Sequence, residues 1–316
     1  MKMTINRSAG RLVAILPLLF AGSRIYTTSA QSPYKVQARW TIGGDGSWDY
    51  LTVDSTAQRL YIAHSTKVDV VDLTTCKEIG AVVGLQGAHG VVLAPDGKTG
   101  FVSDGRANAV VAFDLETFAQ AGKISVGTNP DGMTYEPATN ALVVGTVALP
   151  GKPEFPVADG AGTVFVNIED TNSVLRIEAK SQKITAMWKL VGQAIDVAGG
   201  RLFAVCDGKK MAVTDAKTGQ SLATPSIGDG PDATAFDTKM RLAFSSNEDG
   251  TLTVVDAANG YKVLQNLPTM DGARTMQLDP STGKIYLVSA ELKKVPGAKR
   301  PSAMPNTFTV LVVGRD

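Results

Sequence analysis

The chain has 316 residues, of which 19% are charged and 44% hydrophobic, and it contains 32 glycines and 15 prolines. These proportions indicate a folded, turn-rich chain and exclude an intrinsically disordered one. The net charge is only +1 at pH 7, so no overall charge draws the chain to nucleic acid or to an anionic membrane.

The N-terminal segment has the order of a secretory signal. Three basic residues precede an apolar stretch at 12–21, and small residues follow at 28–30. The apolar stretch is too short to span a bilayer comfortably. We therefore predict a signal peptide at residues 1–30, with a retained N-terminal anchor as the alternative, and a single mature domain at 31–316 without a transmembrane segment, in the periplasm or secreted.

A sequence pattern repeats along the mature chain. Each copy has a polar loop, an apolar run, a turn, an aromatic or β-branched run, a run that ends in an acid, and a Thr/Gly turn. The second residue of each copy lies at position 49, 89, 131, 154, 194, 232 or 274. A period of about 40 residues with four short strands is typical of a β-propeller blade. We therefore predict an all-β fold, a seven-bladed β-propeller of four-stranded antiparallel blades.

The first strand of the mature chain, at 36–42, belongs to no repeat of its own. The last repeat supplies only three strands, at 275–278, 285–288 and 308–313. We predict that the N-terminal strand pairs with the C-terminal strand, completes the last blade and closes the ring.

The third repeat, from Pro130 to Pro153, is about half the usual length. It has room for an inner strand at 132–135, a turn at 137–140 and one more strand at 141–148. We predict that this third blade is truncated to about two strands and that the other six are complete.

The third strand of most repeats ends in an acid. We predict that these acids cap the turn that follows and take no part in catalysis. They are Asp72, Asp114, Glu178, Asp215 and Asp256.

Two cysteines, Cys76 and Cys206, lie in different repeats. We predict that they are unpaired, with a disulfide between blades as the alternative. The sequence has no CxxC, which excludes a zinc knuckle and a redox pair of that type.

Several segments resemble the YVTN-repeat, or YncE-like, β-propeller family. They are Leu60-Tyr61-Ile62-Ala63-His64, Val68-Asp69-Val70-Val71-Asp72, Phe101-Val102-Ser103-Asp104-Gly105, Asn129-Pro130-Asp131, Gly228-Asp229-Gly230-Pro231-Asp232-Ala233 and Gly272-Ala273-Arg274-Thr275-Met276. The resemblance covers essentially the whole mature chain and implies a seven-bladed propeller in the periplasm or outside the cell. It implies little about chemistry, because one fold hosts many functions.

Strand direction places the loops that enter the inner strands on one face, around the mouth of the central channel. Six of the repeats each carry one polar residue at the start of the inner strand: Asp49, His89, Asp131, Glu154, Asp232 and Arg274. We predict that they form a ligand-binding ring. The alternative is a polar, solvated channel without a ligand. His64 is predicted to face solvent in a loop rather than to bind a metal.

The sequence excludes several catalytic templates, since it has no HExxH, no GxSxG and no phosphate loop. Four carboxylates and a histidine suit a divalent cation or a cationic or polyhydroxyl ligand. We predict a monomeric, non-catalytic binding module for a small molecule, a cell-envelope component or a protein. The alternative is a metal-dependent hydrolase of the lactone type, with a carboxylate or His89 as general base. The sequence assigns no cofactor and no catalytic residue, although a divalent cation bound at the mouth is possible. The acidic loop face argues against binding of nucleic acid.

Overall fold

A computed structural model describes residues 33–143, 149–151, 153–168, 171, 173–189, 194–206, 208–297 and 301–316, with the backbone alone at 143 and 206. These residues all belong to one compact unit, Pro33–Asp316. The predicted signal peptide lies outside the described residues. Among the described residues, no helix has the length and apolar character needed to cross a membrane.

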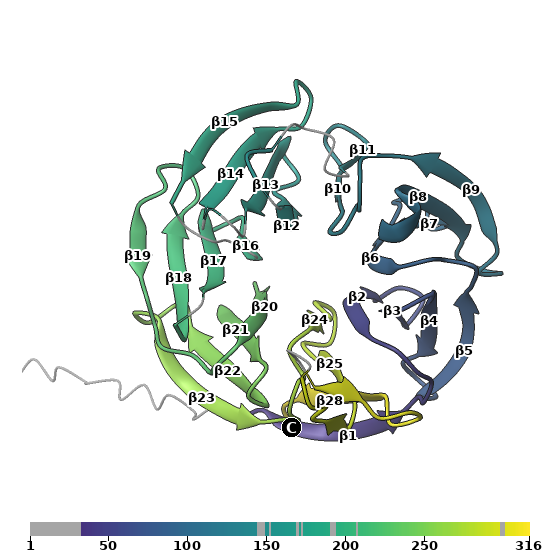
Figure 1. Cartoon of the computed structure of the whole chain (residues 1–316). Helices are drawn as coiled ribbons and strands as arrows, with labels where there is room; N and C mark the ends of the chain where they lie inside the picture. The colour runs from purple at the N-terminus through teal and green to yellow at the C-terminus, as the bar shows by residue number, and fades with distance from the viewer. Residues whose placement is uncertain are drawn as a thin grey trace, which may run out of the picture. The chain divides into compact units, whose positions relative to one another are not determined.

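The described strands form a β-propeller of four-stranded antiparallel blades, as predicted. Six sheets have four strands, and they follow one another around a ring with the first strand of each innermost (Figure 1). The prediction of seven blades is not matched, because six four-stranded blades are present in the described part of the chain. A two-stranded sheet, here called the short sheet, is formed by the third repeat. Only the four-stranded blades are numbered below, and the short sheet lies between the second blade and the third.

The first and second blades consist of β2 (Trp48–Asp54), β3 (Arg59–His64), β4 (Lys67–Asp72) and β5 (Lys77–Val82), then β6 (Ala88–Leu93), β7 (Thr99–Asp104), β8 (Ala109–Asp114) and β9 (Gln120–Ser125). The short sheet consists of β10 (Thr134–Glu136) and β11 (Ala141–Val143). The third and fourth blades consist of β12 (Pro153–Ala158), β13 (Thr163–Ile168), β14 (Ser173–Glu178) and β15 (Lys183–Trp188), then β16 (Ala194–Asp196), β17 (Arg201–Cys206), β18 (Lys210–Asp215) and β19 (Ser221–Ala223).

The fifth blade consists of β20 (Pro231–Asp237), β21 (Leu242–Asn247), β22 (Thr251–Asp256) and β23 (Lys262–Pro268). The sixth consists of β24 (Met276–Leu278), β25 (Ile285–Ser289), β28 (Thr309–Gly314) and β1 (Lys35–Thr41). A small hairpin that the sequence did not predict, β26 (Leu292–Lys293) and β27 (Ser302–Ala303), lies between β25 and β28, and a 3-10 helix, η1 (Gly105–Ala107), follows β7.

The predicted ring closure is confirmed. β1 runs antiparallel to β28 from Lys35 opposite Gly314 to Thr41 opposite Thr309. Trp40 on β1 packs against Tyr286, with ring centroids 6.0 Å apart. This pairing gives the sixth blade its fourth strand.

The short sheet agrees with the prediction for the third repeat as far as it is described. β10 and β11 pair antiparallel, with Tyr135 opposite Leu142. The remainder of the strand predicted at 141–148 lies outside the described residues, at 144–148.

The acids at the ends of third strands cap turns, as predicted. Asp72 accepts hydrogen bonds from the backbone N–H groups of Thr74 at 2.9 Å and Thr75 at 2.6 Å. The same arrangement recurs at Asp114, Asp215 and Asp256, and the Glu178 carboxylate accepts from the Ser181 hydroxyl. The backbone hydrogen bond from Thr75 is the main cause that lowers the pKa of Asp72. Cys76 at the end of this turn is a free thiol.

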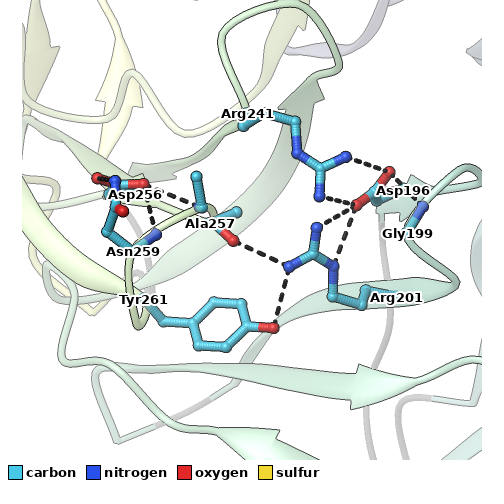
Figure 2. Close-up of polar contacts among 9 residues, drawn as sticks. Asp196, Gly199, Arg201, Arg241, Asp256, Ala257, Asn259 and Tyr261 are labelled. Carbon is cyan, nitrogen blue, oxygen red and sulfur yellow. Dashed lines mark hydrogen bonds and ion pairs between the residues drawn. The ribbon is translucent and has the colours of Figure 1, made fainter. Parts of the chain in front are cut away.

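A cluster of charges joins the fourth blade to the fifth on the face opposite the mouth. Two guanidinium groups converge on the buried carboxylate of Asp196 (Figure 2). Arg201 Nη2 lies 2.6 Å and Arg241 Nη2 3.1 Å from Asp196 Oδ2. Arg201 Nη1 also donates to the carbonyl oxygen of Ala257 and to the hydroxyl of Tyr261, both in the fifth blade. The cluster therefore fixes how the two blades pack.

We predict that Trp40→Ala lowers the free energy of unfolding by about 2 kcal/mol, because it removes a large ring from the closing strand. Arg39→Ala, on the exposed side of the same strand, is the control and leaves it within about 0.5 kcal/mol. Deletion of residues 31–43 abolishes most of the stability. Thermal and urea unfolding followed by circular dichroism measure all three, and an unchanged midpoint for the deletion would contradict the closure argument.

We predict that Asp196→Ala lowers the free energy of unfolding by about 3 kcal/mol, because it leaves two guanidinium groups without their buried counter-ion. Asp229→Ala removes one partner of an exposed pair with Lys209 and costs no more than about 0.5 kcal/mol. Urea unfolding distinguishes the two variants, and equal effects would show that the Asp196 cluster does not join the blades.

Candidate binding site at the channel mouth

The six residues predicted to ring the channel mouth all lie at the starts of inner strands. Asp49, His89, Glu154 and Asp232 are on β2, β6, β12 and β20, whereas Asp131 and Arg274 shortly precede β10 and β24. These six strands are innermost in the ring (Figure 1). Because the inner strands run in the same sense, their first residues lie at the same end of the channel.

A β-bulge marks the start of four of these strands. The register shifts between Trp48 and Leu51 on β2, between Ala88 and Val91 on β6, between Glu154 and Val157 on β12, and between Pro231 and Ala233 on β20. A bulge inserts an extra residue and turns its side chain away from the regular alternation. Asp49, His89 and Asp232 lie within these bulges.

Three of the six residues form one compact cluster. His89 Nδ1 lies 2.6 Å from Asp49 Oδ2 and 3.8 Å from Asp131 Oδ1. One ligand atom from each residue lies within 4.8 Å of the others. The side chains of His89, Asp49 and Asp131 are 27%, 32% and 19% exposed, so the cluster is half-buried and open to a ligand.

A glycine makes room for the His89 ring. A Cβ atom on Gly105 would lie 2.7 Å from His89 Nε2 and 2.7 Å from Asn129 Oδ1, closer than real Cβ contacts come. The ring edge that carries Nε2 therefore lies against the backbone of η1, and Nδ1 points to the carboxylates. A small cavity of about 120 Å³ beside the cluster is lined by Ser47, Trp48, Asp49, Ser65, Thr66, Gln86, Gly87, Ala88, His89 and Arg106.

The carboxylates favour the protonated form of His89. The hydrogen bond with Asp49 raises the pKa of His89 above its ordinary value, and the charge of Asp131 acts in the same direction. Burial and the nearby Arg106 oppose the shift. The imidazolium neutralises one of the two carboxylate charges over the pH range where it keeps its proton.

Tyr50 and Phe155 belong to the site, although the sequence analysis did not assign them. Their rings meet edge to face, with centroids 4.7 Å apart, and both line the central channel, whose cavity is about 400 Å³. Burial raises the pKa of Tyr50 well above its ordinary value, and the charges of Asp131, Asp49 and Glu154 add to the shift. Tyr50 therefore stays protonated next to three carboxylates. Phe155 has a φ of +45°, a strained conformation that is frequent at functional sites.

The sequence could have indicated Tyr50, because it directly follows Asp49 within the bulge. Phe155 gave no such signal, since its contact with Tyr50 joins two repeats about 100 residues apart and depends on the path of the ring.

Of the other three predicted residues, Glu154 lies on β12 and its charge acts on Tyr50, whereas Asp232 and Arg274 form a separate pair. Arg274 Nη1 lies 3.8 Å from Asp232 Oδ1. Arg274 also lines a second cavity, of about 450 Å³, together with Trp48, Glu248 and Leu292. The structure thus divides the predicted ring into an acid–histidine cluster and an arginine-lined pocket.

The prediction for His64 is wrong. Its side chain is 1% exposed and lies on β3, with Nδ1 2.7 Å from Asp69 Oδ2 and its ring 4.4 Å from that of Phe308. His64 faces inward because it stands at the end of a buried strand. Asp104 and Asn247, at the ends of β7 and β21, are also buried and bind backbone groups, so they are structural.

No protein-family model matches the chain, and no curated protein matches its sequence. Its fold is similar to that of a chain in a structure described as "Crystal Structure of Mitotic Checkpoint Complex", with a TM-score of 0.71 and 13% identity over 100% of this chain and 99% of that one. At this identity the likeness shows the fold alone. The chain is a β-propeller.

We predict that the pKa of His89 lies above about 6.5 and falls in Asp49→Asn, because that variant removes the charged acceptor. NMR titration of the imidazole C2–H resonance measures it, and the chain has only one other histidine to assign.

The linked effect on stability has a defined sign. Because the folded-state pKa is raised, the Asp49–His89 contact stabilises the fold fully below about pH 6.5, and this contribution is lost as the pH rises through the folded-state pKa. Asp49→Asn is therefore less stable than the natural protein at pH 5.5, and the difference shrinks at pH 9. A difference that grows with pH would contradict the assignment.

Proposed function

We propose that this chain is an exported β-propeller binding module that receives its ligand at the mouth of the central channel. The observation that carries the proposal is the cluster of Asp49, His89 and Asp131, in which three consecutive inner strands bring three polar side chains within 4.8 Å. A propeller that needed only a solvated channel would not require a bulge and a glycine to seat one histidine between two acids.

The charge and shape of the site favour a ligand with a cationic or polyhydroxyl group. The charges of Asp131, Asp49 and Glu154 all add to the raised pKa of Tyr50, so negative charge is concentrated in the neighbourhood of this side chain. The paired rings of Tyr50 and Phe155 offer an apolar floor. A small molecule, a cell-envelope component or a surface loop of a protein partner fits this chemistry. The solved neighbour is part of a complex, in keeping with a protein partner.

A divalent cation fits the same cluster. Two carboxylate oxygens and one imidazole nitrogen are suitable donors for Zn²⁺ or Mn²⁺. A cation held by Asp49, His89 and Asp131 would take the place of the proton that His89 Nδ1 shares with Asp49. Export by the signal peptide at 1–30 would present this site in the periplasm or outside the cell.

We also infer that the short sheet marks a seventh blade position, which makes the chain a shortened member of the YVTN-repeat type. Its inner strand β10 packs between β6 and β12, as an inner strand of a full blade does. Asp131 also belongs to the segment Asn129-Pro130-Asp131, which leads into β10 and is one of the segments that resemble this family.

A metal-dependent hydrolase of the lactone type is the second candidate. The observation that favours it is that three ligands from three inner strands leave coordination positions open, as catalytic metal sites do. A bound cation would polarise a substrate carbonyl, and a nearby carboxylate such as Glu154 would serve as general base.

We predict that the protein binds Zn²⁺ or Mn²⁺ with a stoichiometry near one and that Asp131→Ala with Glu154→Ala abolishes this binding. Glu116→Ala with Glu291→Ala, which removes two exposed acids elsewhere, is the control and leaves binding unchanged. Isothermal titration calorimetry and elemental analysis of the purified protein measure it. The same stoichiometry in the site variant would place the cation elsewhere.

Assays of simple lactones with the metal-loaded protein separate the two candidates. Binding without turnover supports the binding module. Turnover that is lost with the metal and with Asp131→Ala supports the hydrolase.

A further inference from the structure

The outer side of the short sheet leaves two neighbouring blades uncovered. Each blade normally packs one face against the next blade, and the third and fourth strands of that next blade cover its outer part. The short sheet has only two strands, and among the described residues β11 pairs on one side only, with β10. We call the region beyond β11, between β9 and β15, the open sector.

Two equivalent glycines show how the packing at this sector differs from that between the first and second blades. Gly80 on β5 and Gly122 on β9 lie opposite the fourth residue of the third strand in their blades. A Cβ atom on Gly80 would lie 2.4 Å from the ring of Phe118, which stands in the β8–β9 turn of the next blade. A Cβ atom on Gly122 would meet nothing within 4 Å. In the described part of the short sheet, no turn carries a residue equivalent to Phe118.

Apolar side chains next to this space are exposed in register. Ile124 on β9 pairs with Val110 and is 53% exposed. The residues at the equivalent position of the first and fifth blades, Val82 and Leu267, are 0% and 9% exposed. The sequence thus supplies an interior type of side chain at a position that no described residue covers to the same extent.

The opposite wall of the open sector is also apolar. Met187 and Ile184 on β15 pair with Leu175 and Ile177 and are 59% and 41% exposed. Leu175 and Ile177 belong to the cluster that includes Leu149, in the segment that follows the short sheet. At the position of Met187, the first, second and fifth blades carry Ala81, Lys123 and Asn266. The third blade therefore presents an unusually apolar surface to this sector.

We propose that the open sector is the docking site for a β-hairpin of a partner protein, which adds two strands to the edge of β11 and completes the blade. The number of missing strands defines the shape of the partner, because the other blades place two strands here. Its chemistry follows from the walls: both faces of the hairpin are apolar, one against Ile124 and one against Met187. Its turn carries an aromatic ring that covers Gly122 as Phe118 covers Gly80.

Strand addition supplies the backbone part of this interaction. Among the described residues the outer edge of β11 has no partner strand, so its N–H and C=O groups can pair with an added strand, and pockets for alternate side chains give specificity. The surface is continuous with the contacts between blades, since Val110 of the same face packs with Met133 and Leu142 of the short sheet.

The test uses a fluorescent synthetic peptide with the sequence of residues 109–125 of this chain, which forms β8, its turn with Phe118 and β9 in the second blade. We expect saturable binding to the purified protein by fluorescence anisotropy, and slower deuterium exchange at the amides of 141–143. Ile124→Lys and Met187→Lys each raise the Kd by at least about tenfold. A peptide with Phe118→Ala loses a similar factor.

Leu264→Lys is the matched control, because Leu264 is 52% exposed on the outer strand of the fifth blade, away from the open sector. It leaves the Kd unchanged. Gly122→Phe is a second blocking variant, which is expected to fold because a Cβ atom at this position meets nothing within 4 Å, and which prevents binding. Absence of saturable binding, or equal binding by the sector and control variants, overturns the proposal. A dimer in light scattering that Ile124→Lys converts to monomer also overturns it, because a second copy would then fill the sector.

Discussion

The pairing of β1 with β28 is the interaction on which the rest of the structure depends. A blade is a sheet with two apolar faces, and each face is buried only if the neighbouring blade is present. The contact between the first and sixth blades joins Leu60 and Ile62 with Val288 and Val310, near opposite ends of the chain. Without the closing strand the sixth blade would lack its outer strand and its contact with the first blade would be weakened. The first inner strand, which carries Asp49, would then lose its fixed position.

Closure of the ring also brings equivalent residues of different repeats together in one site. Asp49, His89 and Asp131 are far apart along the chain, and no local structure brings them together. The ring places the starts of consecutive inner strands around one axis, so a polar residue at the same place in each repeat converges with its equivalents. The bulges and Gly105 then determine the detail, in which one imidazole lies between two carboxylates.

The sequence predicted the parts that follow from periodicity. The strands, the turn-capping role of Asp72 and the pairing of the terminal strands all depend on patterns that local chemistry and strand counting reveal. The sequence could not predict that His64 is buried. This side chain lies between Asp69 of its own blade and Phe308, which directly precedes β28 of the sixth blade. Nor could the sequence separate Arg274 from His89, since a repeat pattern gives each residue's place on the ring but not which neighbours its side chain reaches.

The short sheet shows that a blade performs two tasks that can be separated. Its inner strand brings Asp131 to the channel mouth, and β10 does this with β11 as its only described partner in the sheet. The outer strands of a blade hold no mouth residue and serve mainly to cover their neighbours. The described part of the short sheet has no such strands, and there the mouth cluster is intact while Ile124 and Met187 are exposed. Water can satisfy the free edge of β11, whereas exposed apolar side chains each forgo about 1–2 kcal/mol of burial. The cost of the missing strands thus falls on side-chain packing around the outer ring, where an added hairpin would recover it without any change at the mouth.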